Sequence, residues 1–180
     1  DHRDLHSFPT RRSSDLFIVG LAAWASRVSG VIAGICILAT AIIVAYEVVL
    51  RFVFNAPTEW VNETSVYLVM VSAFLGFAPA LAAGKHISVD LVVSNLSPAA
   101  NKALKLLVSL LGLLFSLVFL YTSAEMVLNS YRLNMLSVST LRVPLYLPQM
   151  ALPVGFALLS LQFIANLLDP DSAAAEKGGH

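Results

Sequence analysis

Four long stretches without a charged side chain constrain most strongly what this chain can fold into. They cover residues 28–46, 64–84, 106–124 and 143–168, and none contains Asp, Glu, Lys or Arg. A helix needs about 20 apolar residues to cross a hydrocarbon core of about 30 Å, because each residue adds about 1.5 Å of length. All four stretches are close to this length or longer, so the sequence predicts four transmembrane helices.

Composition agrees with lipid as the surrounding solvent. Hydrophobic residues make up 58% of the chain and charged residues 12%. The 11 basic and 11 acidic residues balance, so the net charge gives no reason to expect a nucleic acid partner. The expected environment is the lipid bilayer.

We therefore predict an all-α integral membrane protein with a four-helix membrane domain over residues 17–168. The spans are expected at about 28–49, 62–84, 104–128 and 146–168. A short interfacial helix is expected before the first span, followed by a turn into the membrane near Arg27, because residues 16–25 are too few to cross and include Trp24. Another is expected between spans two and three, where apolar residues recur at helical spacing from Val89 to Leu96.

The two ends of the chain differ from this domain. Residues 1–16 lack an initiating Met and are rich in Asp, Arg and His, so we interpret them as a non-native or disordered leader. An alternative reads Arg11 and Arg12 as the basic part of a secretory signal, with cleavage near Ala25. Residues 169–180 are low in complexity and are expected to form a disordered tail.

The distribution of Lys and Arg predicts the orientation. With both ends in the cytoplasm, five basic residues lie inside and three outside, which follows the positive-inside rule. The inner set is Arg27, Lys85, Lys102, Lys105 and Lys177, and the outer set is Arg51, Arg132 and Arg142.

Charged residues at the outer ends of the first two spans have structural explanations and alternatives. Glu47 and Arg51 stand four residues apart, which favours a helical ion pair, although Arg51 could instead face another subunit. Glu59 and Glu63 lie at the start of the second span, where the helix dipole favours carboxylates. Acid–base catalysis by this pair is not expected, because no nucleophile accompanies it.

Polar and small residues also recur inside the spans. Tyr121, Glu125 and Asn129 follow at spacing four, so their stripe should face protein, either this chain's own helices or a partner's. Two further pairs fit contacts between helices: Gln162 with Asn166 through hydrogen bonds, and Gly30 with Gly34 through close approach.

Several motifs stand in a fixed order relative to the four spans. They are Glu47 with Arg51-Phe52-Val53-Phe54-Asn55, Trp60 with Glu63, Gly84-Lys85-His86-Ile87-Ser88-Val89-Asp90, and Leu152-Pro153-Val154-Gly155. In combination they resemble the small membrane subunit of tripartite ATP-independent periplasmic (TRAP) transporters, and the resemblance covers residues from about 29 to 168.

The resemblance implies a three-part importer in the bacterial inner membrane. A periplasmic binding protein would capture an organic acid (a dicarboxylate, sialic acid or a similar carboxylate), and a large permease subunit would move it with sodium. The small subunit would be a non-enzymatic scaffold packed against the permease. The candidate partner-interface residues are Arg51, Trp60, Glu63, Lys85, His86 and Asp90.

Two other assignments stay open at this point. One is the small four-helix subunit of a tripartite tricarboxylate transporter, which the Gly84 to Asp90 motif disfavours. The other is the membrane anchor of a quinone-linked oxidoreductase. Haem ligation across four helices needs histidines within the spans, whereas His86 lies in a connection. No cofactor is therefore expected.

Overall fold

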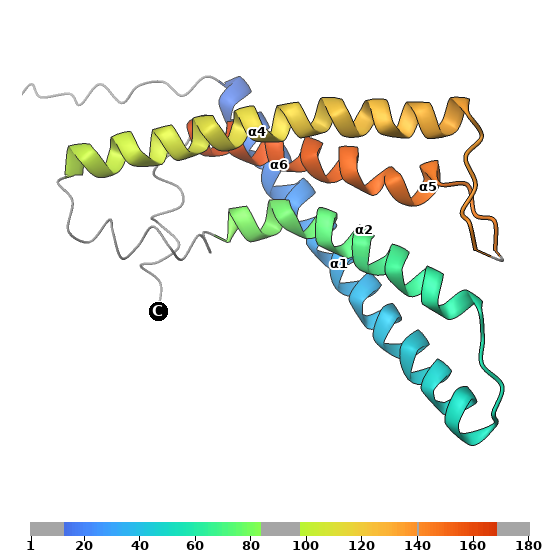
Figure 1. Cartoon of the computed structure of the whole chain (residues 1–180). Coiled ribbons are helices and arrows are strands. Elements are labelled where there is room, and N and C mark those ends of the chain that lie inside the picture. Colours follow the sequence, from blue (N-terminus) through green and yellow to red (C-terminus); the bar gives the residue numbers. More distant parts are fainter. Residues whose placement is uncertain (1–12, 84–97, 140, 169–180) are drawn as a thin grey trace, which may run out of the picture.

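The computed structural model describes residues 13–83, 98–139 and 141–168, and these residues fold almost entirely into helices (Figure 1). Four of the described segments are long and apolar enough to cross a membrane, which confirms the predicted all-α membrane fold. The fourth consists of two helices separated by Met150. The helices are α1 (Ser13–Val53), α2 (Trp60–Ala82), α4 (Pro98–Arg132), α5 (Tyr146–Gln149) and α6 (Ala151–Leu168).

Helix α6 is the central helix of the described bundle. It packs against α4 on one side and against α2 and α1 on the other. The α1–α2 hairpin and the α4–α6 pair diverge toward the end of the molecule that carries the α1–α2 connection (Figure 1). The molecule therefore has the outline of a V, and the α4–α5 loop runs along its open end toward the start of α2.

Aromatic rings fill the space around Phe156 of α6. Its ring lies 5.8 Å from that of Phe74 on α2 and 5.3 Å from that of Phe119 on α4, measured between centroids. Such pairs add packing energy beyond the area that they bury. Phe156 is itself buried, so this cluster ties three helices together at one level.

Close approach of the helices depends on small residues. A Cβ atom added at Gly155 would lie 2.6 Å from the carbonyl oxygen of Phe74, so the two backbones are in direct contact there. Gly30 of α1 lies against the ring of Pro79 in α2, whereas Gly34 has no neighbour within 4 Å of such an added atom. Only the first member of the predicted glycine pair therefore supports helix packing.

Serines line the buried face of α4. Ser116, Ser123 and Ser130 stand seven residues apart and all are buried. The Ser116 hydroxyl is fully buried and its oxygen lies 2.9 Å from that of Ser160 in α6. Hydroxyls that bond across helices replace the water that is missing from a bilayer.

Helix α1 differs from the sequence prediction, because it runs unbroken from Ser13 to Val53 instead of being preceded by a separate interfacial helix. The reason is a continuous packing stripe. Ala22, Ser26, Ser29 and Ala33 are all buried at spacings of four, three and four, so the stripe passes straight through the position of the predicted turn near Arg27. Ser26 donates to Gln162 of α6 at 2.9 Å and anchors the stripe.

Three other predicted segments fall wholly or partly outside the described residues. The expected interfacial helix between spans two and three lies within 84–97, outside the described residues, as do residues 1–12 of the predicted leader and the tail from 169 onward. Helix α4 is longer than the predicted third span and begins at Pro98. Proline suits the first turn of a helix, because the amide hydrogen that it lacks would have no partner there.

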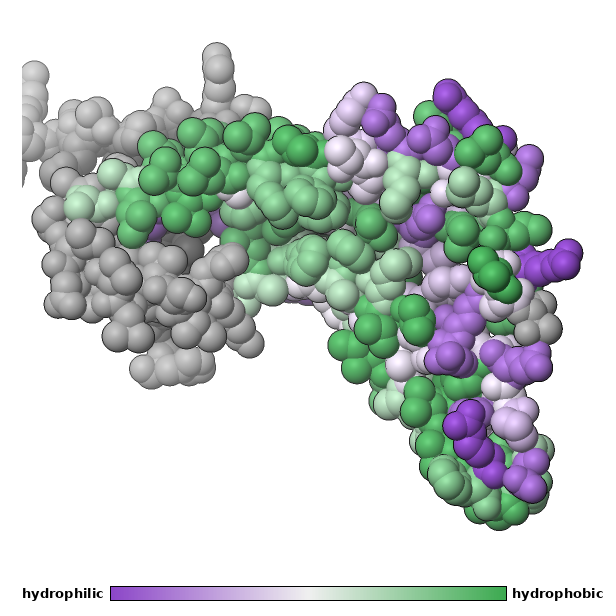
Figure 2. Space-filling model, in the orientation of Figure 1, coloured by the Kyte–Doolittle hydropathy of each residue, from purple (hydrophilic) through white to green (hydrophobic). Residues whose placement is uncertain are grey.

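Hydrophobic and hydrophilic side chains occupy different parts of the described surface. Hydrophobic side chains cover the helices, whereas hydrophilic ones gather at the end where the α1–α2 connection and the α4–α5 loop lie (Figure 2). We call this end the outer end, following the orientation predicted from Lys and Arg.

Candidate partner interface

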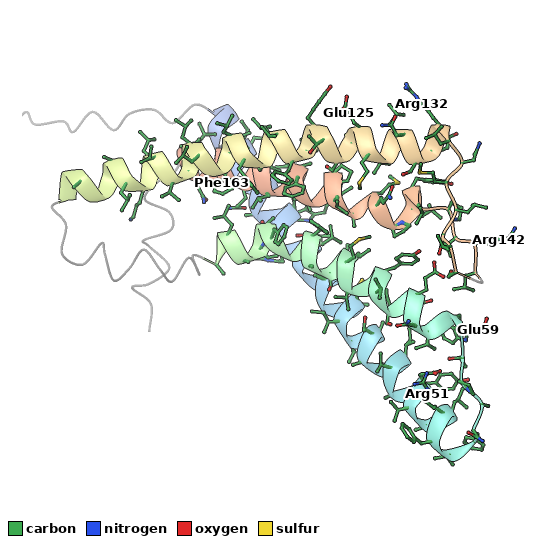
Figure 3. The ribbon with its side chains drawn as sticks, in the orientation of Figure 1. Arg51, Glu59, Glu125, Arg132, Arg142 and Phe163 are labelled. Carbon is green, nitrogen blue, oxygen red and sulfur yellow. The ribbon has the colours of Figure 1, made fainter. Side chains whose placement is uncertain are left out.

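Arg51 lies in the last turn of α1, at the outer end, where Figure 3 shows it near the tip of the α1–α2 hairpin. Its Nη2 atom is 3.5 Å from Oε1 of Glu47, which confirms the predicted ion pair. The Arg51 side chain is 61% exposed, whereas that of Glu47 is only 13% exposed. The guanidinium can therefore contact another molecule while keeping its pairing with Glu47.

The Glu47 side chain is fixed by hydrogen bonds from the α1–α2 connection. Its carboxylate accepts a hydrogen bond from the backbone N–H of Thr58, 3.1 Å from Oε2, and another from the Thr58 hydroxyl. Between them Asn55 adopts a positive φ of 51°, a conformation that Asn tolerates better than most residues. The hydrogen bonds between Thr58 and Glu47 therefore hold the connection against α1.

Trp60 begins helix α2 beside this connection. Its ring lies 6.4 Å from that of Tyr46 on α1, and its side chain is partly exposed. Tyr131 and Tyr146 form a second aromatic pair at the outer end, with ring centroids 5.4 Å apart. Amphipathic rings at this level are typical of the border between lipid tails and water.

Glu63 connects α2 to the α4–α5 loop, which we call the outer loop (residues 133–139 and 141–145). The carboxylate accepts hydrogen bonds from the Tyr67 hydroxyl at 2.5 Å and from the Ser139 hydroxyl. The outer loop is itself ordered by backbone hydrogen bonds, from Ser137 to Val143 at 2.8 Å and from Leu145 to Met135 at 3.0 Å. Both oxygens of Glu63 are therefore engaged by this chain's own hydroxyls.

Metal binding and acid–base chemistry find no support at this end of the molecule. Among the described residues, no group of three or more His, Cys, Asp or Glu side chains could hold a metal ion. The Glu63 carboxylate is occupied by hydrogen bonds from the Tyr67 and Ser139 hydroxyls. The Glu59 side chain makes no capping hydrogen bond.

The comparison with protein families assigns the chain to a family. Residues 40–172 match the family model of the tripartite ATP-independent periplasmic transporters, DctQ component, which is about three quarters of the chain. The chain belongs to this family. It is thus a TRAP transporter component and a multi-pass membrane protein. The match also separates it from a tricarboxylate transporter subunit and from a quinone-linked anchor.

Two curated relatives are small permease proteins of TRAP transporters. The ectoine TRAP transporter small permease protein TeaB of Halomonas elongata is 23% identical over 139 residues, which cover 77% of this chain and 72% of the relative. A putative TRAP transporter small permease protein of Haemophilus influenzae is 36% identical over 73 residues, which cover 41% of this chain and 45% of that relative.

The structure brings three of the six candidate interface residues of this small TRAP permease subunit to the same end. Arg51, Trp60 and Glu63 all lie at or next to the α1–α2 connection. Lys85, His86 and Asp90 fall outside the described residues, so the structure does not place them.

Sequence reasoning missed the partners of the two carboxylates. Thr58 binds Glu47 across 11 residues, and Ser139 binds Glu63 across 76 residues. Neither contact has a local signal, because serine and threonine hydroxyls are common in loops. The serine repeat of α4 could have been recognised from the sequence, since a spacing of seven returns to the same helix face.

Replacing Arg51 by glutamine tests its assignment to the partner interface. The isolated subunit should lose less than about 0.5 kcal/mol of stability, since exposed pairs four residues apart contribute only that much. Recovery of the large permease by affinity purification should fall several-fold. Thr122→Ala, an exposed change on α4, is the control for general effects on expression. Unchanged recovery in Arg51→Gln would remove Arg51 from the interface.

Proposed function

We propose that this chain is a non-enzymatic scaffold for the large permease of a sodium-coupled TRAP importer in the bacterial inner membrane. A periplasmic binding protein would deliver an organic acid such as a dicarboxylate, sialic acid or a similar carboxylate. The large permease would carry the solute, and this chain would hold its static part in place. Both termini would lie in the cytoplasm.

Tight packing around α6 is the observation that carries the scaffold role. Gly155 meets the backbone of Phe74, and the ring of Phe163 lies within 3 Å of where a Cβ of Gly112 would stand. Ser116, which contacts Ser160 of α6, is also fully buried. Helices that approach this closely leave no room for a hydrated solute, so the described bundle is suited to support and not to conduction.

A groove on the surface of α1 and α2 also fits a supporting role. Its volume is about 590 Å³. Its lining consists of Ile37, Thr40, Ala41, Val44, Val69, Ser72 and Ala73. A carboxylate would lose its hydration in such a groove without gaining a cation or a set of donors, which makes binding unfavourable.

The candidate contacts with the permease follow from position and from the family motifs. Arg51 and Trp60 present exposed side chains at the outer end. Glu63 would act indirectly, by fixing the outer loop. Lys85, His86 and Asp90 are proposed as contacts at the cytoplasmic side, on the basis of the sequence motif alone.

Reconstitution tests this function directly. The large permease encoded beside this chain would be placed in liposomes with the chain, without it, and in a third sample that holds the chain alone. Uptake of labelled succinate or N-acetylneuraminate, each with its binding protein, would be measured with sodium outside. We expect uptake only with both subunits present, and its loss when choline replaces sodium.

Two results would contradict the proposal. Full uptake by the permease alone would remove the scaffold role, and uptake by the chain alone would show that it encloses a pathway. Unchanged uptake in choline would remove the sodium coupling while leaving the scaffold role intact.

A further inference from the structure

Helix α4 has two opposite faces of different character. One face carries the buried serines and packs on α6. The other carries six exposed residues at spacings of three and four, which place them in one line along the helix. We call this line the α4 ridge, and it consists of Leu114, Val118, Tyr121, Glu125, Leu128 and Arg132.

A carboxylate stands in the middle of the outer half of this ridge. Figure 3 shows Glu125 and Arg132 on the side of α4 that points away from α6. The Tyr121 hydroxyl donates to Oε1 of Glu125 at 2.7 Å, and the Tyr121 side chain is 64% exposed. Within the described residues, the only ion pair joins Arg51 to Glu47 and leaves the Glu125 charge without a cation.

Glu125 lies too deep to rest in water. It precedes Arg132 by seven residues, or about 10 Å along the helix axis, and it lies about 9 Å deeper than Tyr131 of the outer aromatic pair. Its neighbours along the ridge, Tyr121 and Leu128, are both exposed. A carboxylate at such a level is unfavourable against lipid, so the ridge needs a protein neighbour that supplies a donor or a cation.

We propose that the α4 ridge docks against a transmembrane helix of the large permease that offers Glu125 an Arg, Lys or neutral hydrogen-bond donor. This inference rests on the proposed function, since it names the face by which the scaffold binds. The structure thereby resolves the choice left open by the polar stripe: Tyr121 and Glu125 face away from this chain's own helices.

A second copy of this chain fits the ridge poorly. Two copies in one membrane run parallel, and a two-fold axis along the membrane normal brings identical residues together at equal depth. Glu125 would then face Glu125, and Arg132 would face Arg132. Like charges at close range in a medium of low dielectric repel strongly, so a partner of different sequence is favoured.

Photocrosslinking in the co-expressed complex tests the docking. Benzoylphenylalanine would be placed at Val118 or Leu128 on the ridge and, as the matched control, at Leu38 on the exposed side of α1. We expect adducts to the large permease from the ridge positions, several-fold stronger than from Leu38. Adducts to a second small subunit, or no protein adduct from the ridge, would overturn the inference.

Substitution of Glu125 provides the second measurement. Glu125→Leu should lower recovery of the large permease at least five-fold, and Glu125→Gln should retain part of it. The melting temperature of the isolated subunit should stay within about 2 °C, because within the described part of the chain Glu125 bonds only to the exposed Tyr121. Wild-type recovery with Glu125→Leu would overturn the inference.

These outcomes separate the inference from the function on which it rests. If the permease co-purifies with the wild-type chain but no ridge position crosslinks to it, the scaffold role is retained and the α4 ridge is rejected as the docking face. If the permease does not co-purify with the wild-type chain at all, both fail.

Discussion

Replacing Gly155 by leucine is expected to prevent the described helices from assembling. The added Cβ would lie 2.6 Å from the carbonyl oxygen and 2.9 Å from the carbonyl carbon of Phe74. Backbone atoms of a facing helix cannot turn aside as a side chain can, so α2 and α6 would have to separate. Overpacking typically costs about 1–3 kcal/mol, and a leucine against backbone should exceed this range. The readout is the fraction of monodisperse protein in detergent and its melting temperature.

Two other glycines serve as graded controls for this substitution. Gly34→Leu should be tolerated, because nothing lies within 4 Å of a Cβ at that position. Gly112→Ala should lower the melting temperature less than Gly155→Leu, because the atoms in its way belong to the Phe163 ring, which can rotate. A Gly155→Leu protein as stable as Gly34→Leu would show that the contact with Phe74 does not hold the bundle together.

Replacing Glu63 by alanine is expected to release the outer loop from α2. The change removes the acceptor for the Tyr67 and Ser139 hydroxyls. Loss of two hydrogen bonds to a charged group should increase local opening of the outer loop about ten-fold. Hydrogen exchange of residues 133–139 and 141–145 should accelerate by that factor, while exchange in α6 should change much less.

Glu59→Ala is the matched control for Glu63→Ala. Both carboxylates stand at the start of α2, but Glu59 is exposed and makes no side-chain capping bond. Its removal should leave exchange of the outer loop unchanged. Equal effects of the two substitutions would mean that negative charge at the helix start, and not the contact with Ser139, orders the loop.

The membrane fold could be predicted from the sequence because lipid leaves few alternatives. A continuous apolar stretch of about 20 residues is expected to become a helix, because a helix satisfies all its backbone groups within one segment, whereas a barrel strand is shorter and alternates in polarity. One contact within a helix was also predictable. The Glu47 to Arg51 ion pair forms at spacing four, as expected. Gln162 and Asn166, which were expected to bond between helices, bond to each other at 3.2 Å.

Contacts between distant segments could not be predicted in the same way. Ser26 meets Gln162 across 136 residues, and this contact is part of what makes α1 continuous where a turn was expected. Ser139 meets Glu63 only because the outer loop runs along the open end of the V. Hydrophobic periodicity identifies the buried face of a helix but not its neighbour, so the central place of α6 required the structure.

The length of α1 has a consequence for how the molecule sits in its membrane. Its 41 residues extend about 61 Å, twice the thickness of the hydrocarbon layer. If it stood upright, its exposed Phe17 would lie about 16 Å beyond the predicted start of the first span, out in the water, and Trp24 about 6 Å beyond it. An oblique crossing keeps both rings among the lipid headgroups, where aromatic side chains are favoured. The first turns of α1 would then leave the bilayer at a shallow angle and lie along its surface.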